Sequence, residues 1–229
     1  MAIKYHKKLT ALFFVAVCAL SAQAQADKFT YEISITNLTR GQSFTPILGA
    51  THRRGIHLFA LGSPASDELA ILAESGNTEP LTGLLQSTRK VAEIKTSAGL
   101  LDPGKTKTMT LKANKRARYL SMAAMLIPTN DAFVSLNAVA LPQGRQGVVY
   151  YARAYDAGSE PNDELCANIP GPVCQGEGGS PDAGGEGFVH VHAGIHKLGD
   201  DLVELNAAER DWRNPVALVK IVRIRAEDD

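Results

Sequence analysis

Positions 155–164 of the chain read YDAGSEPNDE and place four carboxylates beside glycine and proline. Asp156, Glu160, Asp163 and Glu164 therefore follow an apolar run in a segment that favours a tight turn. Carboxylates that converge repel one another unless a proton or a cation lies between them. The segment has three interpretations: a solvated acidic loop, a pair of acid–base catalysts, or a site for a hard divalent cation.

A further carboxylate lies in the segment LIPTND, between two other apolar runs. If the runs beside Asp131 and Asp156 form neighbouring strands, their loops meet at one end of the fold and bring Glu160 with them. Calcium takes about six to eight oxygen ligands, which these carboxylates, backbone carbonyls and water supply. With that strand order, Asp131, Asp156 and Glu160 are the expected ligands of a calcium ion.

The segment HVHAGIH is a rival metal-binding pattern, with His190, His192 and His196. Residues i and i+2 of a strand point to the same face, so His190 and His192 reach one metal if His196 joins them from a turn. Three imidazoles with an open fourth position are typical of catalytic zinc. The alternatives are an exported metal-dependent enzyme and a half-exposed edge strand whose histidines face solvent or carbonyl groups.

The N-terminus has the composition of a secretory signal peptide. Three lysines precede a 12-residue apolar run, LTALFFVAVCAL, and the segment SAQA then ends in Ala-x-Ala. We expect cleavage after Ala24, which leaves residues 25–229 as one exported domain in the periplasm or outside the cell. The apolar run is too short to span a bilayer, and we expect no transmembrane segment.

Charge and cysteine content agree with an exported binding protein. The 229 residues hold 24 Lys and Arg and 24 Asp and Glu, so the loss of three lysines with residues 1–24 leaves a slightly acidic chain. Such a chain does not attract nucleic acid by bulk charge. Cys166 and Cys174 remain after the signal peptide is removed, and they predict a disulfide. The short loop that it closes would stabilise the fold by about 2–3 kcal/mol.

Strand patterns dominate the remaining chain. The segment FTYEISITN alternates apolar and polar residues, which is typical of a half-buried antiparallel strand. One segment, SPASDELAILAESGN, predicts a helix that begins after Ser66 and ends at Gly76. Many strands with one helical insertion predict an all-β fold, an antiparallel β-sandwich. Besides 29–37, strands are predicted at 106–113, 117–127, 132–141, 147–155, 187–195 and 216–225.

Four long segments occur in a familiar order: NLTRGQSFTPILGATH, LGSPASDELAILAESG, SMAAMLIPTNDAFVSLNAVALP and YDAGSEPNDELCANIPGP. Together they resemble a bacterial spondin domain, the N-terminal type of the extracellular-matrix protein F-spondin. The resemblance extends from about Phe29 to Arg225. It implies a β-sandwich similar to calcium-binding, membrane-associating sandwiches, and a role in extracellular binding rather than catalysis.

The same resemblance implies calcium as the cofactor. In animal spondin domains, an Asp of a PDWFVG-type loop and two Asp of DAGTD bind calcium. The matching residues are Asp131 in NDAFVS and Asp156 and Glu160 in DAGSE. Nothing in the animal motif matches Asp163 and Glu164, so we expect these two to be ordinary surface charges. Ala132 replaces Trp, and Glu160 replaces Asp with a longer arm that still carries a carboxylate. The expected partner is a ligand at the cell envelope or outside the cell, whose identity the sequence leaves open.

Overall fold

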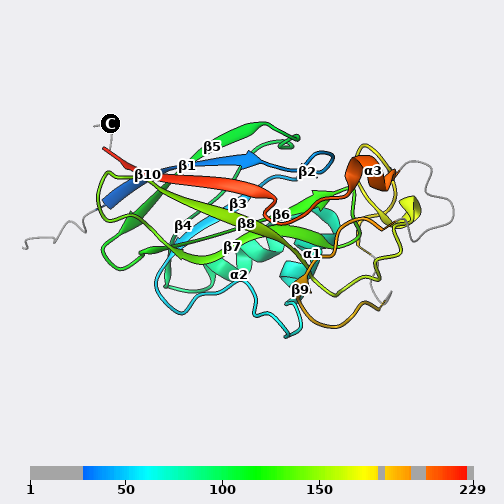
Figure 1. Ribbon diagram of the computed structural model, residues 1–229. Coiled ribbons are helices and arrows are strands. Elements are labelled where there is room, and N and C mark those ends of the chain that lie inside the picture. The colour runs from blue at the N-terminus through cyan, green and yellow to red at the C-terminus, as the bar shows by residue number, and fades with distance from the viewer. Residues whose placement is uncertain (1–27, 180–183, 197–204, 226–229) are drawn as a thin grey trace, which may run out of the picture.

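The computed structural model describes residues 28–179, 184–196 and 205–225, and its ten strands form one antiparallel sheet (Figure 1). The order across the sheet is β4-β3-β6-β7-β8-β10-β1-β5, and β2 and β9 pair with β6 and β8. The predicted signal peptide lies outside the described residues. The strands are β1 (Lys28–Asn37), β2 (Ser43–Phe44), β3 (Leu48–His52), β4 (Val91–Thr96), β5 (Thr106–Asn114), β6 (Tyr119–Ile127), β7 (Ala132–Ala140), β8 (Val148–Asp156), β9 (His190–Val191) and β10 (Ala217–Ile224).

The sheet curls until strands near its two edges approach each other. Thr51 of β3 donates a hydrogen bond of 2.6 Å to the carbonyl of Lys112 in β5, although these strands are far apart in the sheet order. Side chains from both halves meet in one interior, where Ile33 of β1 and Val134 of β7 are fully buried. The predicted all-β fold with a short helical insertion is confirmed, and its two layers are halves of one nearly closed sheet.

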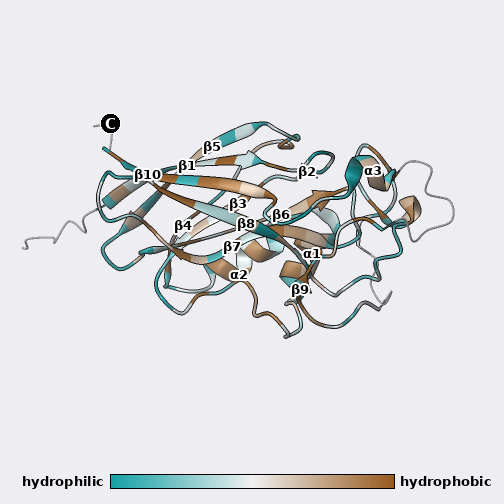
Figure 2. Ribbon diagram, viewed as in Figure 1, coloured by the Kyte–Doolittle hydropathy of each residue, from teal (hydrophilic) through white to brown (hydrophobic). Residues whose placement is uncertain are grey.

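Alternation of residue type explains the two faces of β1. Its inward side chains, Tyr31, Ile33 and Ile35, are buried, whereas Glu32 between them is exposed. β10 pairs with β1 in an antiparallel register in which Thr30 lies opposite Ile224. In Figure 2, β10 is hydrophobic along most of its length, in agreement with its place between β8 and β1.

Two helices, α1 (Asp67–Ser75) and α2 (Glu79–Gln86), cover the outer face of β3, β6 and β7. Leu69 and Leu72 of α1 are fully buried in a second core cluster, together with Phe133 of β7. The predicted helix ends are confirmed: the Ser66 side chain accepts a hydrogen bond from the Leu69 N–H, and Gly76 ends the helix at φ 71°. Helical cover on one side and the sheet interior on the other bury the middle of the sheet on both faces.

Several elements differ from the sequence prediction. β2, β3 and β4 were not expected, α2 is a second helix where only one was predicted, and the strand expected over 187–195 is limited to β9. The disulfide between Cys166 and Cys174 is confirmed. Across the described residues, no helix has both the length and the apolar character needed to cross a membrane. The remaining short elements are a 3-10 helix, η1 (Cys166–Asn168), and α3 (Ala207–Arg210).

Candidate functional site

The loops that carry the predicted calcium ligands meet at one end of the sheet. The first residue of β7, Ala132, lies opposite the last residue of β8, Asp156, because these strands pair directly. Asp131 therefore lies beside the loop that follows β8. Its Oδ2 accepts hydrogen bonds from the backbone N–H groups of Ser159 and Glu160, at 2.8 and 3.1 Å. The pairing of β7 with β8 brings Asp131 beside the loop of Asp156, and Glu160 approaches Asp131 through its backbone N–H.

All three acidic side chains are buried, with exposed fractions of 0% for Asp131 and 1% for Asp156 and Glu160. Burial, and next the neighbouring Asp156 carboxylate, raise the pKa of Asp131 to about 8. Burial also raises the pKa of Asp156, although hydrogen bonds from Asn162 and Gly158 and the nearby His190 act in the opposite direction. Without a cation, the pair therefore retains a proton near neutral pH.

The surroundings of one carboxylate oxygen of Asp131 indicate whether these residues can accommodate a cation. Oδ1 of Asp131 is buried and has no hydrogen-bond partner among the described residues. Buried polar atoms in proteins almost always have a partner, so such an oxygen marks a place for a proton or a cation. Asp131, Asp156 and Glu160 offer only oxygen ligands, which suit calcium. These residues would hold the ion, and its charge would offset the repulsion between their carboxylates.

Gly158 allows the turn after Asp156 to approach a distant part of the chain. It has a φ of 67°, and a Cβ at this position would overlap the backbone of Phe188. The Gly187 N–H donates a hydrogen bond of 2.9 Å to the Gly158 carbonyl. A residue with a side chain would separate the turn from the segment that leads to His190. Gly158 thus allows the turn after Asp156 to pack against the segment that leads to His190. Both lie at the end of the sheet that carries the buried carboxylates, which we call the acidic end.

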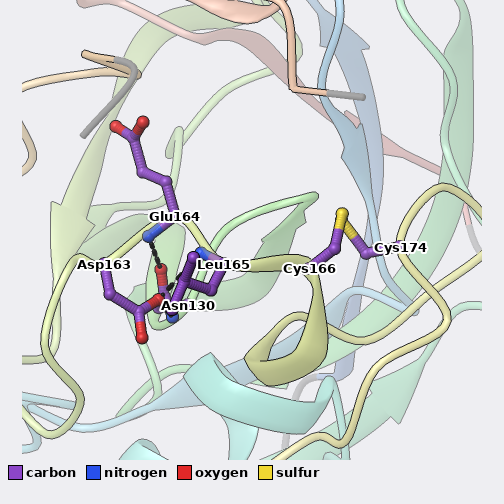
Figure 3. Close-up of a disulfide and its surroundings, with 6 residues drawn as sticks. All are labelled: Asn130, Asp163, Glu164, Leu165, Cys166 and Cys174. Carbon is purple, nitrogen blue, oxygen red and sulfur yellow. Dashed lines mark hydrogen bonds between the residues drawn. A yellow bond between two sulfur atoms is a disulfide. The ribbon is translucent and has the colours of Figure 1, made fainter. Parts of the chain in front are cut away.

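The expectation that Asp163 and Glu164 are surface charges was wrong. Asp163 accepts hydrogen bonds from the Asn130 side chain and the Leu165 N–H, each 2.9 Å long, and from Asn168 Nδ2 at 2.6 Å. The Glu164 N–H donates to Asn130 Oδ1, and Glu164 is only 3% exposed (Figure 3). Because Asn130 precedes Asp131, these bonds fasten the 163–165 segment to the loop of a predicted calcium ligand.

The three histidines lie at this end of the sheet but in different surroundings. His190 Nε2 is 3.4 Å from Asp156 Oδ1, and His192 Nε2 is 3.6 Å from Asp156 Oδ2, so both rings face one carboxylate. His192 is buried, and its ring packs against the Trp212 ring with centroids 5.0 Å apart. His196 is exposed, and its N–H donates to the Glu164 side chain.

A different group of three side chains places its potential metal-binding atoms close to one another. Among the described residues, one atom each from Asp156, Glu186 and His190 lie within 4.8 Å of one another. This group shares only Asp156 with the predicted calcium ligands. The sequence analysis missed Glu186, which lies in a Gly-rich loop. No local spacing reveals Glu186, because its position beside His190 depends on the contact between the Gly158 turn and the backbone of Phe188.

Comparison with known protein families agrees with the sequence resemblance. The family model described as Spondin_N matches residues 29–161. This range covers more than half of the chain and includes Asp131, Asp156 and Glu160. No curated protein matches the chain.

Proposed function

Because the chain belongs to the Spondin_N family, we propose that it is an exported, calcium-binding module that attaches to a ligand at the cell envelope or outside the cell. The family consists of extracellular domains that are in general not enzymes. The confirmed disulfide agrees with an oxidising compartment. Calcium at Asp131, Asp156 and Glu160 would fix the loops at one end of the sheet, and these loops would present the binding surface.

The observation that carries this proposal is the burial of three carboxylates at one end of the sheet. Desolvation of a carboxylate is costly unless a positive charge or hydrogen bonds compensate for it. The hydrogen bonds to Asp131 reach only Oδ2, which leaves Oδ1 for another partner. A divalent cation supplies that partner and reduces the repulsion from Asp156.

A zinc enzyme built on His190, His192 and His196 has less support. The Gly194 N–H donates to Nδ1 of His192 at 3.0 Å, so Nδ1 carries the lone pair and the neutral ring carries its hydrogen on Nε2. Burial lowers the pKa of His192 to about 4, so the ring is neutral at physiological pH. His192 would have to give up the bond to Gly194 before either nitrogen became available to a metal.

Heat unfolding of the exported chain, with calcium or with a chelator, tests the calcium proposal. At a calcium concentration about 100 times Kd, binding stabilises the folded state by about 2.7 kcal/mol. For a chain of this size, that corresponds to a rise in Tm of roughly 5–10 °C. Asp131→Asn should abolish the rise and should slightly stabilise the metal-free protein, because it removes a buried acid beside Asp156.

Glu32→Gln is the matched control, since it removes an exposed carboxylate from β1 far from these loops. This variant should keep the full calcium response. The absence of a Tm change in the wild-type protein at millimolar calcium would refute the proposal. An equal rise in Asp131→Asn would also contradict it, by placing the calcium elsewhere.

A further inference from the structure

We propose a second cation site, for a zinc-like transition metal, formed by His190 Nε2, Asp156 Oδ1 and Glu186 Oε2. The three residues come from β9, the end of β8 and the loop before β9. Asp156 and His190 lie directly opposite each other in the β8–β9 pair. Residues that lie directly opposite each other on two paired strands place their side chains on the same face of the sheet. The site does not depend on calcium at Asp131 and Glu160.

Hydrogen bonding determines which nitrogen of His190 is free to bind. His190 Nδ1 lies 3.2 Å from the carbonyl oxygen of Val191. A carbonyl only accepts hydrogen bonds, so Nδ1 carries the hydrogen and Nε2 of the neutral ring carries the lone pair. A histidine that binds a metal characteristically donates its other N–H to a carbonyl or carboxylate in this way.

The lone pair of His190 Nε2 faces two acids. Asp156 Oδ1 is 3.4 Å away and Glu186 Oε2 is 3.8 Å away. Nε2 is buried and makes no hydrogen bond to any described residue. Three electron-rich atoms that converge without a hydrogen between them need a positive charge at their centre. A metal ion or a proton on His190 would supply it.

The distances favour a metal over a proton. A charged N–H···O bond has a length of about 2.7–2.9 Å, which is shorter than either separation. Zinc binds nitrogen and oxygen at about 2.0–2.2 Å, so two ligands across a tetrahedral angle lie roughly 3.3–3.6 Å apart. The His190–Asp156 separation of 3.4 Å falls in this range, and the Glu186 separation exceeds it only slightly.

Neighbouring residues hold the ligands in position. Asn162 Nδ2 donates to Asp156 Oδ2 at 2.7 Å and to Glu186 Oε1 at 3.2 Å, and the Gly158 N–H donates to Asp156 Oδ1 at 2.8 Å. These bonds orient both acids so that one oxygen of each faces His190. His192 is 5% exposed by its side chain, and its Nε2, which has no hydrogen-bond partner, points toward Asp156 Oδ2. With its hydrogen on Nε2, His192 is a positioning residue for Asp156 rather than a ligand.

The ligand types select the metal. Imidazole with two carboxylates suits zinc and related divalent transition metals, whereas calcium strongly prefers an all-oxygen site. The side chains of His190 and Glu186 are 28% and 39% exposed, so the site opens to solvent on one side. Water would complete the coordination from that side.

Isothermal titration of the chelator-treated exported chain with zinc chloride, in saturating calcium, tests this site. We expect one zinc per chain. His190→Gln should weaken zinc binding at least about 100-fold, because it removes the only nitrogen ligand, and Glu186→Gln should weaken it about tenfold or more. Both variants should keep the calcium response. Asp131→Asn should show the opposite pattern, with zinc binding retained and the calcium response lost.

His196→Gln is the matched control and should bind zinc like the wild-type protein. Cobalt provides a second readout, since tetrahedral binding gives strong visible absorption that His190→Gln should lose. Glu186 lies in an exposed loop, so its variant remains informative if His190→Gln fails to fold. Zinc binding that survives both variants, or no zinc binding by the wild-type protein, would overturn the proposal.

Discussion

The two ends of β8 carry opposite charges, and they differ in how water reaches those charges. Before β8, a cavity of about 300 Å³ is lined by basic residues that include Lys28, Arg145, Arg223 and Arg225. After β8, Asp131, Asp156 and Glu160 are buried. Nine residues of strand separate the two ends, a distance of roughly 30 Å.

The basic side chains at the start of β8 either have partners within the protein or are exposed to water. The Arg223 guanidinium lies 3.8 Å from the centre of the Phe29 ring and donates a hydrogen bond of 2.8 Å to the Gln143 carbonyl. Arg145 and Arg225 are exposed and can be hydrated. The buried carboxylates of the other end lack such hydration. The comparison shows that burial of charge, rather than charge itself, distinguishes a candidate ion site on this molecule.

The largest expected difference between the two ends is in pH dependence. The raised pKa of Asp131, about 8 in the metal-free protein, means that calcium must displace a proton. Calcium affinity should therefore increase by up to about tenfold per pH unit between pH 5 and pH 8. Titration calorimetry in buffers of different ionisation enthalpy measures both the affinity and the protons released.

In the metal-free protein, the raised pKa of Asp131 has the opposite effect on stability: the folded state becomes less stable as pH rises. A carboxyl whose pKa is raised on folding destabilises the folded state progressively as pH rises from its unfolded value, about 4, to about 8. The lowered pKa of His192 acts in the lower half of the same range and in the opposite direction, because it removes stability as pH falls from about 6.5 to about 4. A calcium affinity that stays constant between pH 5 and pH 8 would contradict the assignment of Asp131 as a buried ligand.

The next largest effect should come from Asp163. Replacement with alanine leaves the Asn130 and Asn168 side chains and the Leu165 N–H without their acceptor. We expect the free energy of unfolding to fall by about 2–3 kcal/mol, with or without calcium. Urea unfolding measures this loss. Glu32→Ala, an exposed acid replaced in the same way, should change stability by less than about 0.5 kcal/mol.

The smallest effect should come from the basic end. Arg145→Gln removes an exposed charge beside the cavity, and we expect a change in unfolding free energy within about 0.5 kcal/mol. Its calcium response should equal that of the wild-type protein, as measured by heat unfolding. A loss of stability comparable to that of Asp163→Ala would show that the basic end also depends on a buried or paired charge.

Local sequence signals predicted much of the fold. Alternation identified β1, and the cap residues Ser66 and Gly76 identified both ends of α1. β3 has the sequence LGATH and is buried on both faces, so it shows no alternation and was missed. Strand pairing, together with the family resemblance, was enough to bring Asp131 to Asp156.

Long-range contacts account for the errors at the site. Asp163 lies in a segment with the composition of a surface loop, but Asn130, more than thirty positions earlier, makes it a half-buried hydrogen-bond acceptor. The spacing of His190 and His192 correctly placed both rings on one side of the chain, where they face the two oxygens of Asp156. The nearness of Glu186 depends on the turn at Gly158, which a local pattern does not reveal.

The pairing of β1 with β10 also determines how the molecule would respond to mechanical load. Thr30 lies opposite Ile224, so Lys28 and Arg225 emerge side by side at the basic end. A pulling force between these two positions would open the strand pair like a zipper, one hydrogen-bonded pair at a time. A tether at either position would instead leave the acidic end facing outward and free of strain. Any partner that binds the acidic loops would therefore meet them at the far end of the molecule from such an attachment.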